Sequence, residues 1–323
     1  MPRARRSRSV KDHAHPQVTA RRVIAVIVTH RPQIRATRAL LLALAPQVDE
    51  VVVVDNGSPP ESVSALSEAT RALGMTLLDL GSNRGIGAAQ NAGIAWARER
   101  DADFLLLSDQ DSIPADDMVV RLLAGFSRAE ATGLPVAAVG PITVDKRNGD
   151  AVLLFWEERW GPRRARVPDE EGALVPSAFL IASGCLISAE ALDAVGLMNE
   201  PWFIDHIDLE WGLRARKAGY TLYGVAGAYL RHELGDRVQR IPGRSRDVHI
   251  HSAVRNYYMA RNTVLLIRSG LMVRRWCWGY AAWITKYTVF YILSVPPRAV
   301  RARLLLRGLM DGLRGRTGPQ KTR

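Results

Sequence analysis

The 323 residues, of which 47% are hydrophobic and 24% charged, can fill one large domain or two ordinary ones, which excludes a disordered or fibrous chain. The formal net charge of +12 is concentrated at the ends, because residues 1–22 carry +6 and residues 248–323 carry +13, whereas residues 23–247 carry −7. This distribution excludes a uniformly basic nucleic-acid-binding body and suits an anionic membrane surface, while two cysteines exclude a disulfide framework and favour a reducing compartment.

The first half of the chain shows strands alternating with helices. Residues 1–22 are arginine-rich, which is typical of a disordered tail, and no apolar run follows that would indicate a secretory signal. The apolar runs typical of buried strands are 22–30, 49–55, 75–80 and 102–109, and the segments of helical periodicity are 33–47, 61–74 and 88–100. Such alternation predicts βαβ units, so we expect an α/β protein with a mostly parallel, Rossmann-like sheet.

The second half is less regular. We expect a strand at 136–143, loops or hairpins over 145–177, an apolar extended run at 178–188 and a helix at 189–197. The segment 202–220 begins extended and becomes a helix, and a strand follows. Residues 23–247 are therefore assigned to one domain, and residues 248–323 to a basic, aromatic-rich helical region that is interrupted near Gly270.

Polar or glycine-rich residues follow four of the expected strands. They are Thr29 after the first strand, Asp55 after the second, the loop 81–87 after the third and the pair 109–111 after the fourth. In an open α/β sheet, ligands bind outside the carboxyl ends of the strands. We therefore expect one continuous crevice, although loops are polar in any protein.

The loop 81–87 invites a dinucleotide interpretation through Gly85-Ile86-Gly87. The match is weak, because Gln90 stands where the fingerprint has its third glycine. The loop can still bring backbone N–H groups and the Arg84 side chain near a phosphate. A nucleotide is therefore expected, without nicotinamide.

Two carboxylates, Asp109 and Asp111, end the fourth strand two residues apart. Side chains at i and i+2 of a strand point the same way, and carboxylates that close repel unless a cation lies nearby. Mg²⁺ and Mn²⁺ prefer oxygen ligands and share them with substrate phosphates, so the pair indicates a metal site at a diphosphate. The alternative is a strand end capped by turn-forming aspartates.

Four motifs in this order resemble glycosyltransferase family 2. They are Asp55, the loop and helix 83–94, the D-x-D at 109–111 and the segment "FIDHIDLEWGLRARKAGY" at 203–220. The likeness covers residues 22–235 and is strongest to the rhamnosyltransferase branch, with galactofuranosyltransferases as near relatives. It implies the nucleotide-sugar-binding GT-A fold.

The resemblance also implies a reaction. The expected activity is inverting transfer of L-rhamnose from dTDP-rhamnose to a saccharide or lipid-linked acceptor in cell-envelope polysaccharide synthesis, with Mn²⁺ or Mg²⁺ as cofactor. A galactofuranosyl or other hexosyl transferase that uses a UDP-sugar is the alternative. Two other classes stay open: a non-catalytic nucleotide-sugar-binding module, and a nucleic-acid-binding protein.

On the donor side, the resemblance assigns roles to residues at the strand ends. Asp55 would hold the base of the nucleotide, and Thr29 and Arg84 would line its pocket. Asp109 would contact the ribose or the metal, and Asp111 would ligate the metal.

Further site residues come from the second half of the chain. His232 would join the metal, although a lone histidine after a strand is more often structural. Ser183 and Gly184 match a loop near the acceptor in the family.

On the acceptor side, the resemblance makes Asp208 the base that takes the proton of the acceptor hydroxyl. The family often has Glu-Asp here, whereas this chain has Ile207-Asp208, so Asp205 and Glu210 are rival candidates. Aromatic neighbours such as Trp202 can raise the pKa of a carboxyl toward the range of a base. The alternative is that Asp208 is the N-cap of the helix that follows.

The aromatic segment 276–295 is long enough to cross a bilayer. Lys286 lies in its middle and arginines flank both ends, contrary to the usual charge asymmetry. We expect helices that lie on the inner face of the cell membrane, which makes the protein cytoplasmic and peripheral. A true span, or a soluble helical subdomain that forms a homo-oligomer interface, are the alternatives.

Overall fold

The computed structural model of the chain describes residues 21–145, 151–232, 237–239 and 248–320. The tail predicted at 1–22 therefore lies outside these ranges apart from Arg21 and Arg22, and so does the domain boundary expected at residue 247. Within the described ranges, no helix combines the length and the apolar character needed to cross a bilayer.

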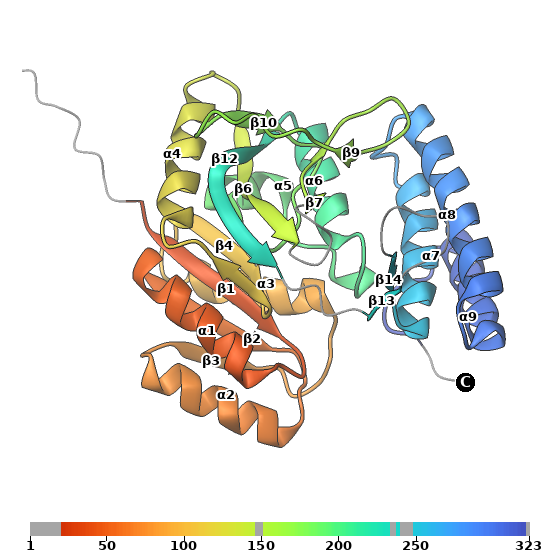
Figure 1. Cartoon of the computed structure of the whole chain (residues 1–323), viewed down its shortest axis with the longest axis horizontal. Helices are drawn as coiled ribbons and strands as arrows, with labels where there is room; N and C mark the ends of the chain where they lie inside the picture. The colour runs from red at the N-terminus through yellow and green to blue at the C-terminus, as the bar shows by residue number, and fades with distance from the viewer. Residues whose placement is uncertain (1–20, 146–150, 233–236, 240–247, 321–323) are drawn as a thin grey trace, which may run out of the picture.

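A mixed sheet forms the centre of the molecule (Figure 1). Its first half is parallel throughout and consists, in spatial order, of β3 (Thr76–Asp79), β2 (Glu50–Asp55), β1 (Val23–Thr29) and β4 (Phe104–Asp109). Its second half continues with β11 (Cys185–Ser188), β6 (Val136–Asp145), β12 (Thr221–His232) and β10 (Leu174–Pro176). β6 and β12 are parallel to each other, whereas β11 and β10 run antiparallel to their neighbours, so the expected mostly parallel sheet is confirmed.

Short strands complete the sheet margins. β5 (Ser112–Pro114) pairs with the end of β12, and β7 (Ala151–Val152) pairs with β6. Two separate two-stranded antiparallel sheets pair β8 (Phe155–Trp156) with β9 (Arg163–Arg164) and β13 (Arg237–Gln239) with β14 (Val248–Ile250). The segment 145–177, predicted as loops or hairpins, therefore contains short strands, as expected.

Helices cover both faces of the sheet because side chains alternate along its buried strands. Val23, Ala25 and Ile27 of β1 pack on the side of α1 (Ile34–Leu44) and α4 (Met118–Glu130). Ile24 and Val26 pack on the opposite side, which carries α3 (Ile86–Arg98), α5 (Ala189–Val195) and α6 (Ile207–Lys217). The helix α2 (Pro60–Ala72) lies beside β3 at the sheet edge.

Three C-terminal helices pack beside the sheet, side by side in Figure 1: α7 (Ala253–Arg268), α8 (Arg274–Ser294) and α9 (Arg298–Leu313). The expected helical region is confirmed, and Gly270 interrupts it with a left-handed φ of 71°. α7 and α9 approach closely at two glycines, since a Cβ on Gly308 would lie 2.4 Å from the carbonyl oxygen of Tyr257, and one on Gly312 2.7 Å from that of Arg261.

Candidate active site

A cleft of about 540 Å³ opens at the carboxyl ends of β1, β2 and β4, where an open α/β sheet binds its ligands. It lies where the polar strand ends predicted a crevice. The N-terminal turns of α3 and α6 form its opposite rim, and α7 contributes Arg255. Among the described residues, the acidic ones that line it are Asp109, Asp111, Asp205 and Asp208.

Asp109 is oriented by a serine relay beneath the cleft. The hydroxyl of Ser112 donates to Ser183 at 3.2 Å, and the Ser183 hydroxyl donates to Asp109 Oδ2 at 2.5 Å. Ser183 is buried and does not line the cleft. Gly184 has a φ of 79°, and a Cβ there would lie 2.6 Å from Pro141, so it belongs to the support of this strand end as well.

Asp55 and Thr29 are fully buried under the cleft floor. Asp55 accepts three hydrogen bonds: from the Thr29 hydroxyl at 2.9 Å, from the Ser58 hydroxyl at 2.6 Å and from the Ser58 backbone N–H at 2.7 Å. Such donors offset the cost of burying a polar side chain. The pair therefore shapes the turn after β2, whose Asn56 reaches the cleft lining.

The glycine-rich loop contacts the acceptor-side segment rather than presenting free donors. The N–H groups of Arg84, Gly85 and Ile86 donate to Asn56 Oδ1, Asn83 Oδ1 and the Phe203 carbonyl at 2.8, 3.0 and 2.7 Å. The Arg84 side chain is exposed, donates to the Leu80 carbonyl at 3.1 Å and is absent from the described lining. These groups therefore form contacts within the protein, and their proximity to a phosphate stays a prediction.

Gly85 is required where this loop meets the segment. Its φ is 92°, and a Cβ would lie 2.6 Å from the Phe203 carbonyl oxygen. Any larger residue would push the two sides of the cleft apart.

The segment 203–206 is strained. Phe203, Asp205 and His206 have left-handed φ values of 69°, 67° and 63°, and each such residue costs on the order of 1–3 kcal/mol. The Asn262 side chain on α7 compensates by donating to the carbonyls of Trp202, Ile204 and Asp205 at 3.0, 2.7 and 3.0 Å. Strain that a neighbouring helix holds in place is typical of functional sites.

Trp202 is buried and lies outside the described cleft lining. Its carbonyl accepts from Arg261 as well as Asn262, at 2.7 and 3.0 Å. It therefore anchors the strained segment to α7.

The three rival carboxylates have different partners. Glu210 is buried away from the cleft, and its Oε1 pairs with Arg214 Nε at 2.8 Å. Asp205 lines the cleft, but its Oδ1 accepts from Nε and Nη2 of Arg255 at 3.0 and 2.9 Å. These ion pairs engage Glu210 and Asp205, so among the three rivals Asp208 stays the predicted base.

Asp208 lies in the first turn of α6, where its Oδ1 accepts from the Leu209 N–H at 2.9 Å. Burial raises the pKa of Asp208 to about 6, and the nearby charges of Asp109 and Asp205 add to the increase. A carboxyl with a pKa of about 6 is mostly ionised at neutral pH yet basic enough to take a proton. The N-cap of α6 is His206, so the alternative of Asp208 as the N-cap is wrong.

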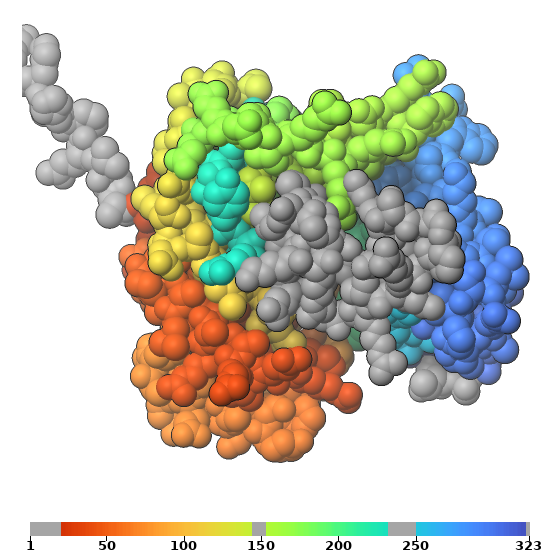
Figure 2. Space-filling view, viewed as in Figure 1, coloured from red at the N-terminus to blue at the C-terminus, as the bar shows by residue number. Residues whose placement is uncertain are grey.

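Beyond Asp208, the cleft adjoins an aromatic recess. His206 lines both the cleft and a neighbouring cavity of about 280 Å³ that Trp160, Tyr280 and Trp283 also line. Burial lowers the pKa of His206 to about 4, so its imidazole is neutral at pH 7, and its Nε2 lies 2.9 Å from the Thr263 hydroxyl. Residues 151–180, green in Figure 2, run along the top of the view and reach the C-terminal helices.

His232 ends β12, where its backbone pairs with Ser112, the residue after Asp111. Its side chain is outside the part of the chain that the structure describes. Among the described residues, no three His, Cys, Asp or Glu side chains form a metal-binding group.

Sequence reasoning missed the contribution of α7. Arg255 and Asn262 are seven residues apart, which puts them on one helix face, and both contact Asp205. Polar residues at helical spacing within an apolar stretch were the available signal.

The comparisons with known proteins agree on a family. The sequence model described as Glycosyl transferase family 2 matches residues 23–194, more than half of the chain. The chain is 29% identical over 296 residues to the dTDP-rhamnosyl transferase RfbF of Shigella flexneri, with 92% of this chain and 97% of that protein covered. It is 25% identical over 223 residues to the galactofuranosyltransferase GlfT1 of Mycolicibacterium smegmatis, with 66% and 71% covered.

A solved structure supports the fold. The mannosyltransferase PcManGT from Pyrobaculum calidifontis, in complex with GDP-Man and Mn²⁺, aligns with a TM-score of 0.52 and 17% identity, covering 91% of this chain and 88% of that one. At this identity the likeness concerns the fold alone. The expected GT-A fold and the resemblance to rhamnosyltransferases are confirmed, and the chain belongs to glycosyltransferase family 2.

Proposed function

We propose that the protein transfers L-rhamnose from dTDP-rhamnose, with inversion, to a saccharide or lipid-linked acceptor in cell-envelope polysaccharide synthesis. The observation that carries this proposal is the similarity to the Shigella dTDP-rhamnosyl transferase over 92% of this chain and 97% of that protein. The cleft supports it, because a carboxyl with a raised pKa lies opposite the two carboxylates at the end of β4.

The nucleotide is proposed to bind on the β1–β2 side of the cleft. Asn56 and His30 line that side, and Asp55 and Thr29 hold the turn that carries Asn56. Arg84 is assigned to the same side through its backbone hydrogen bond to Asn56. The diphosphate then lies toward Asp109 and Asp111.

The residues at the end of β4 fit a divalent cation. Mg²⁺ is usually bound by one or two carboxylates together with substrate phosphates rather than by an all-protein cage, so Asp109 and Asp111 suffice without a third ligand. His232 is the further candidate, since its backbone pairs beside Asp111. When bound, Mn²⁺ or Mg²⁺ supplies positive charge to the leaving diphosphate.

Asp208 is proposed as the base. The acceptor hydroxyl enters between Asp208 and the aromatic recess, gives its proton to the carboxylate and attacks C1 of the sugar, while the bond from C1 to the diphosphate oxygen breaks. Attack opposite the leaving group inverts C1. Asp205, which pairs with Arg255, adds to the increase that burial causes in the pKa of Asp208.

A second candidate function is transfer of galactofuranose or another hexose from a UDP-sugar, which the similarity to the Mycolicibacterium galactofuranosyltransferase favours. The test is a screen of purified protein against dTDP-rhamnose, UDP-galactofuranose and other nucleotide sugars, with Mn²⁺ or EDTA, in which release of the nucleoside diphosphate is measured.

Turnover of dTDP-rhamnose above all others supports the first candidate, and preference for a UDP-sugar supports the second. Stabilisation by dTDP or UDP without any turnover would favour a binding module instead. Stabilisation only by a short nucleic-acid duplex would favour a nucleic-acid-binding protein. A cytoplasmic protein attached peripherally to the inner face of the membrane suits a lipid-linked acceptor.

A further inference from the structure

The outward face of α9 carries an apolar edge beside a basic edge. Because a helix turns about 100° per residue, each set of residues spaced three, four or seven apart falls on one edge. The apolar residues are Leu306, Met310 and Leu313, which are 53%, 47% and 64% exposed. The basic residues are Arg303, Arg307 and Arg314. These six residues are called the α9 face below.

The opposite side of α9 is fixed. Gly308 and Gly312 pack directly on the backbone of α7, and Leu305 is fully buried between the helices. The buried Arg301 donates to the carbonyls of Pro296 and His251 at 3.1 and 2.9 Å. The helix therefore cannot rotate to bury Leu306 or Leu313, and the α9 face stays exposed on a rigid support.

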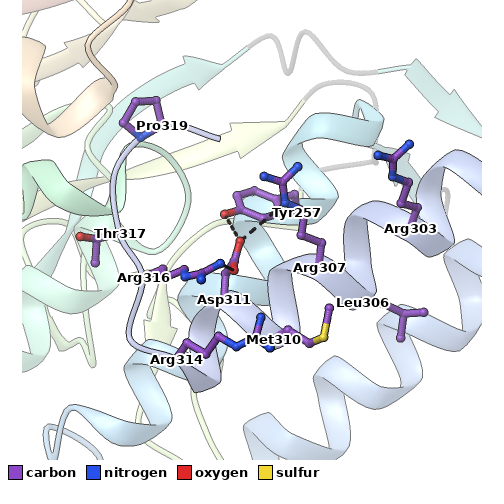
Figure 3. Close-up of a pocket in the computed structure, with 10 residues that line it drawn as sticks. All are labelled: Tyr257, Arg303, Leu306, Arg307, Met310, Asp311, Arg314, Arg316, Thr317 and Pro319. Carbon is purple, nitrogen blue, oxygen red and sulfur yellow. Dashed lines mark hydrogen bonds and ion pairs between the residues drawn. The ribbon is translucent and has the colours of Figure 1, made fainter. Parts of the chain in front are cut away.

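A basic pocket of about 990 Å³ lies along the basic edge, between α9 and the segment after it (Figure 3). Figure 3 shows Arg307, Arg316 and the Tyr257 hydroxyl converging on Asp311. Asp311 accepts from the Tyr257 hydroxyl at 2.9 Å and pairs with Arg316 at 3.0 Å and with Arg307 at 3.8 Å. The Asp311 carboxylate thus forms ion pairs with two of the arginines, Arg307 and Arg316.

Arg303 and Arg314 line the same pocket and form no ion pair within the described residues. With Asp311 as its acidic member, the described lining has an excess of three positive charges. An anion is the ligand that this charge attracts, and a guanidinium binds phosphate oxygens in a bidentate manner.

We propose that the α9 face is a membrane-docking surface, on which Leu306, Met310 and Leu313 enter the interface of an anionic phospholipid bilayer and a lipid phosphate binds between Arg303 and Arg314. A helix with one apolar and one arginine-rich edge suits this position. A soluble anion or a nucleic acid would leave the three apolar side chains in water. A second copy of the face would bring like charges together.

The docking surface is assigned to α9, and two tyrosines of the aromatic helix α8 are engaged within the bundle. Tyr287 and Tyr291 of α8 bond to the α7 side of the bundle, through Asn256 Nδ2 at 2.7 Å and the His251 N–H at 3.2 Å. Their rings contact each other with centroids 4.5 Å apart and planes inclined at 45°. These aromatic side chains therefore stabilise the helical bundle.

The experiment is sedimentation of the full chain with vesicles of phosphatidylcholine alone or mixed equally with phosphatidylglycerol, at several salt concentrations. We expect binding to the mixed vesicles that weakens with salt, and little binding to the neutral ones. The double variant Arg303→Gln/Arg314→Gln should weaken binding about 30-fold, because each basic residue near an anionic surface contributes about a factor of five.

The chain offers matched controls on α1. Arg35→Gln/Arg38→Gln removes the same charge from two exposed arginines and should change vesicle binding less than threefold. Leu306→Ser should weaken binding about tenfold, whereas Leu42→Ser, at a leucine that is 52% exposed against 53% for Leu306, should not. Circular dichroism and thermal melting verify that each variant is folded.

Equal losses for the two arginine pairs would show that only net charge matters and would overturn the proposal. Equal vesicle binding by the Leu306→Ser and Leu42→Ser variants would also overturn it. That result would mean that the apolar edge does not enter the bilayer and that the site is purely ionic, so that it would bind free phosphate as well. Concentration-dependent dimers that Leu306→Ser abolishes, detected by analytical ultracentrifugation, would assign the face to a second copy instead. The proposal deepens the lipid-linked part of the proposed function, but vesicle binding is measured without donor sugar, so either can fail alone.

Discussion

Replacing Asp208 with asparagine tests the assignment of the base most directly. The change keeps the size of the side chain and the oxygen that accepts from the Leu209 N–H, but it removes the proton acceptor. We expect kcat to fall by about 10²–10⁴-fold, the usual contribution of a general base, while the affinity for dTDP changes little. For the native protein, kcat/KM should fall about tenfold per pH unit below pH 6, because the pKa of Asp208 is about 6 and the base must be ionised.

The same substitution should make the fold more stable at neutral pH. A raised pKa means that the folded protein binds the proton more tightly than the unfolded chain does, so stability from this group is full below pH 4 and declines as the pH rises to about 6. The increase in the pKa of Asp208 from its ordinary value of 3.8 corresponds to a loss of unfolding free energy at neutral pH of at most about 3 kcal/mol. Asp208→Asn should therefore melt at a higher temperature than the native protein at pH 8, with the difference vanishing near pH 4.

The assay is release of nucleoside diphosphate from dTDP-rhamnose, combined with thermal melting across pH 4–8. Asp205→Asn is the informative comparison, since Asp205 lines the same cleft but pairs with Arg255. An active Asp208→Asn beside an inactive, folded Asp205→Asn that still binds dTDP would refute the assignment. If kcat/KM did not change between pH 5 and pH 7, the raised pKa of Asp208 would not be the source of its basicity.

Three further predictions follow from neighbouring contacts. Asp111→Asn or excess EDTA should lower turnover at least ~10²-fold, and near-normal activity in EDTA would contradict the metal proposal. Glu210→Gln should leave kcat within about threefold but lower the melting temperature, because the buried end of the Arg214 ion pair is lost; a large loss of kcat would return Glu210 to the list of bases. Asn262→Ala should lower kcat more than tenfold with little change in donor affinity, since the carbonyls of Ile204 and Asp205 lose the Asn262 donor and the Trp202 carbonyl keeps Arg261 alone; unchanged kinetics would show that the strain is not needed.

The sheet was predictable because its strands are marked by local pattern. Apolar β-branched runs such as 51–54 are buried on both faces, and each ends in polar residues that lie at the same edge. The pairing of β11 between β4 and β6 was not predictable in the same way. Its four residues, Cys185–Ser188, carry no signal of direction, and the antiparallel register depends on contacts distant in sequence.

The candidate site was predictable as a set of residue types but not as a set of contacts. Ser183 was expected near the acceptor, yet it donates to Asp109, because the chain before β11 runs beside the end of β4. Likewise, the pattern at 205–210 offers three carboxylates and cannot rank them. Their ranking comes from partners outside the local segment, Arg214 for Glu210 and Arg255 for Asp205.

The C-terminal helices link the two ends of the proposed reaction. Arg261 on α7 donates to the carbonyl of Trp202, next to the strained segment, and also to the carbonyl of Gly318 beyond α9. The close contact of Gly308 with the Tyr257 carbonyl fixes α9 against the same helix. The α9 face is thus one helix away from Arg255 and Asn262, which hold Asp205. Because α7 carries both sets of contacts, the proposed docking would hold the acceptor side of the cleft at a fixed position relative to the lipid surface, where the proposed lipid-linked acceptor would present its sugar.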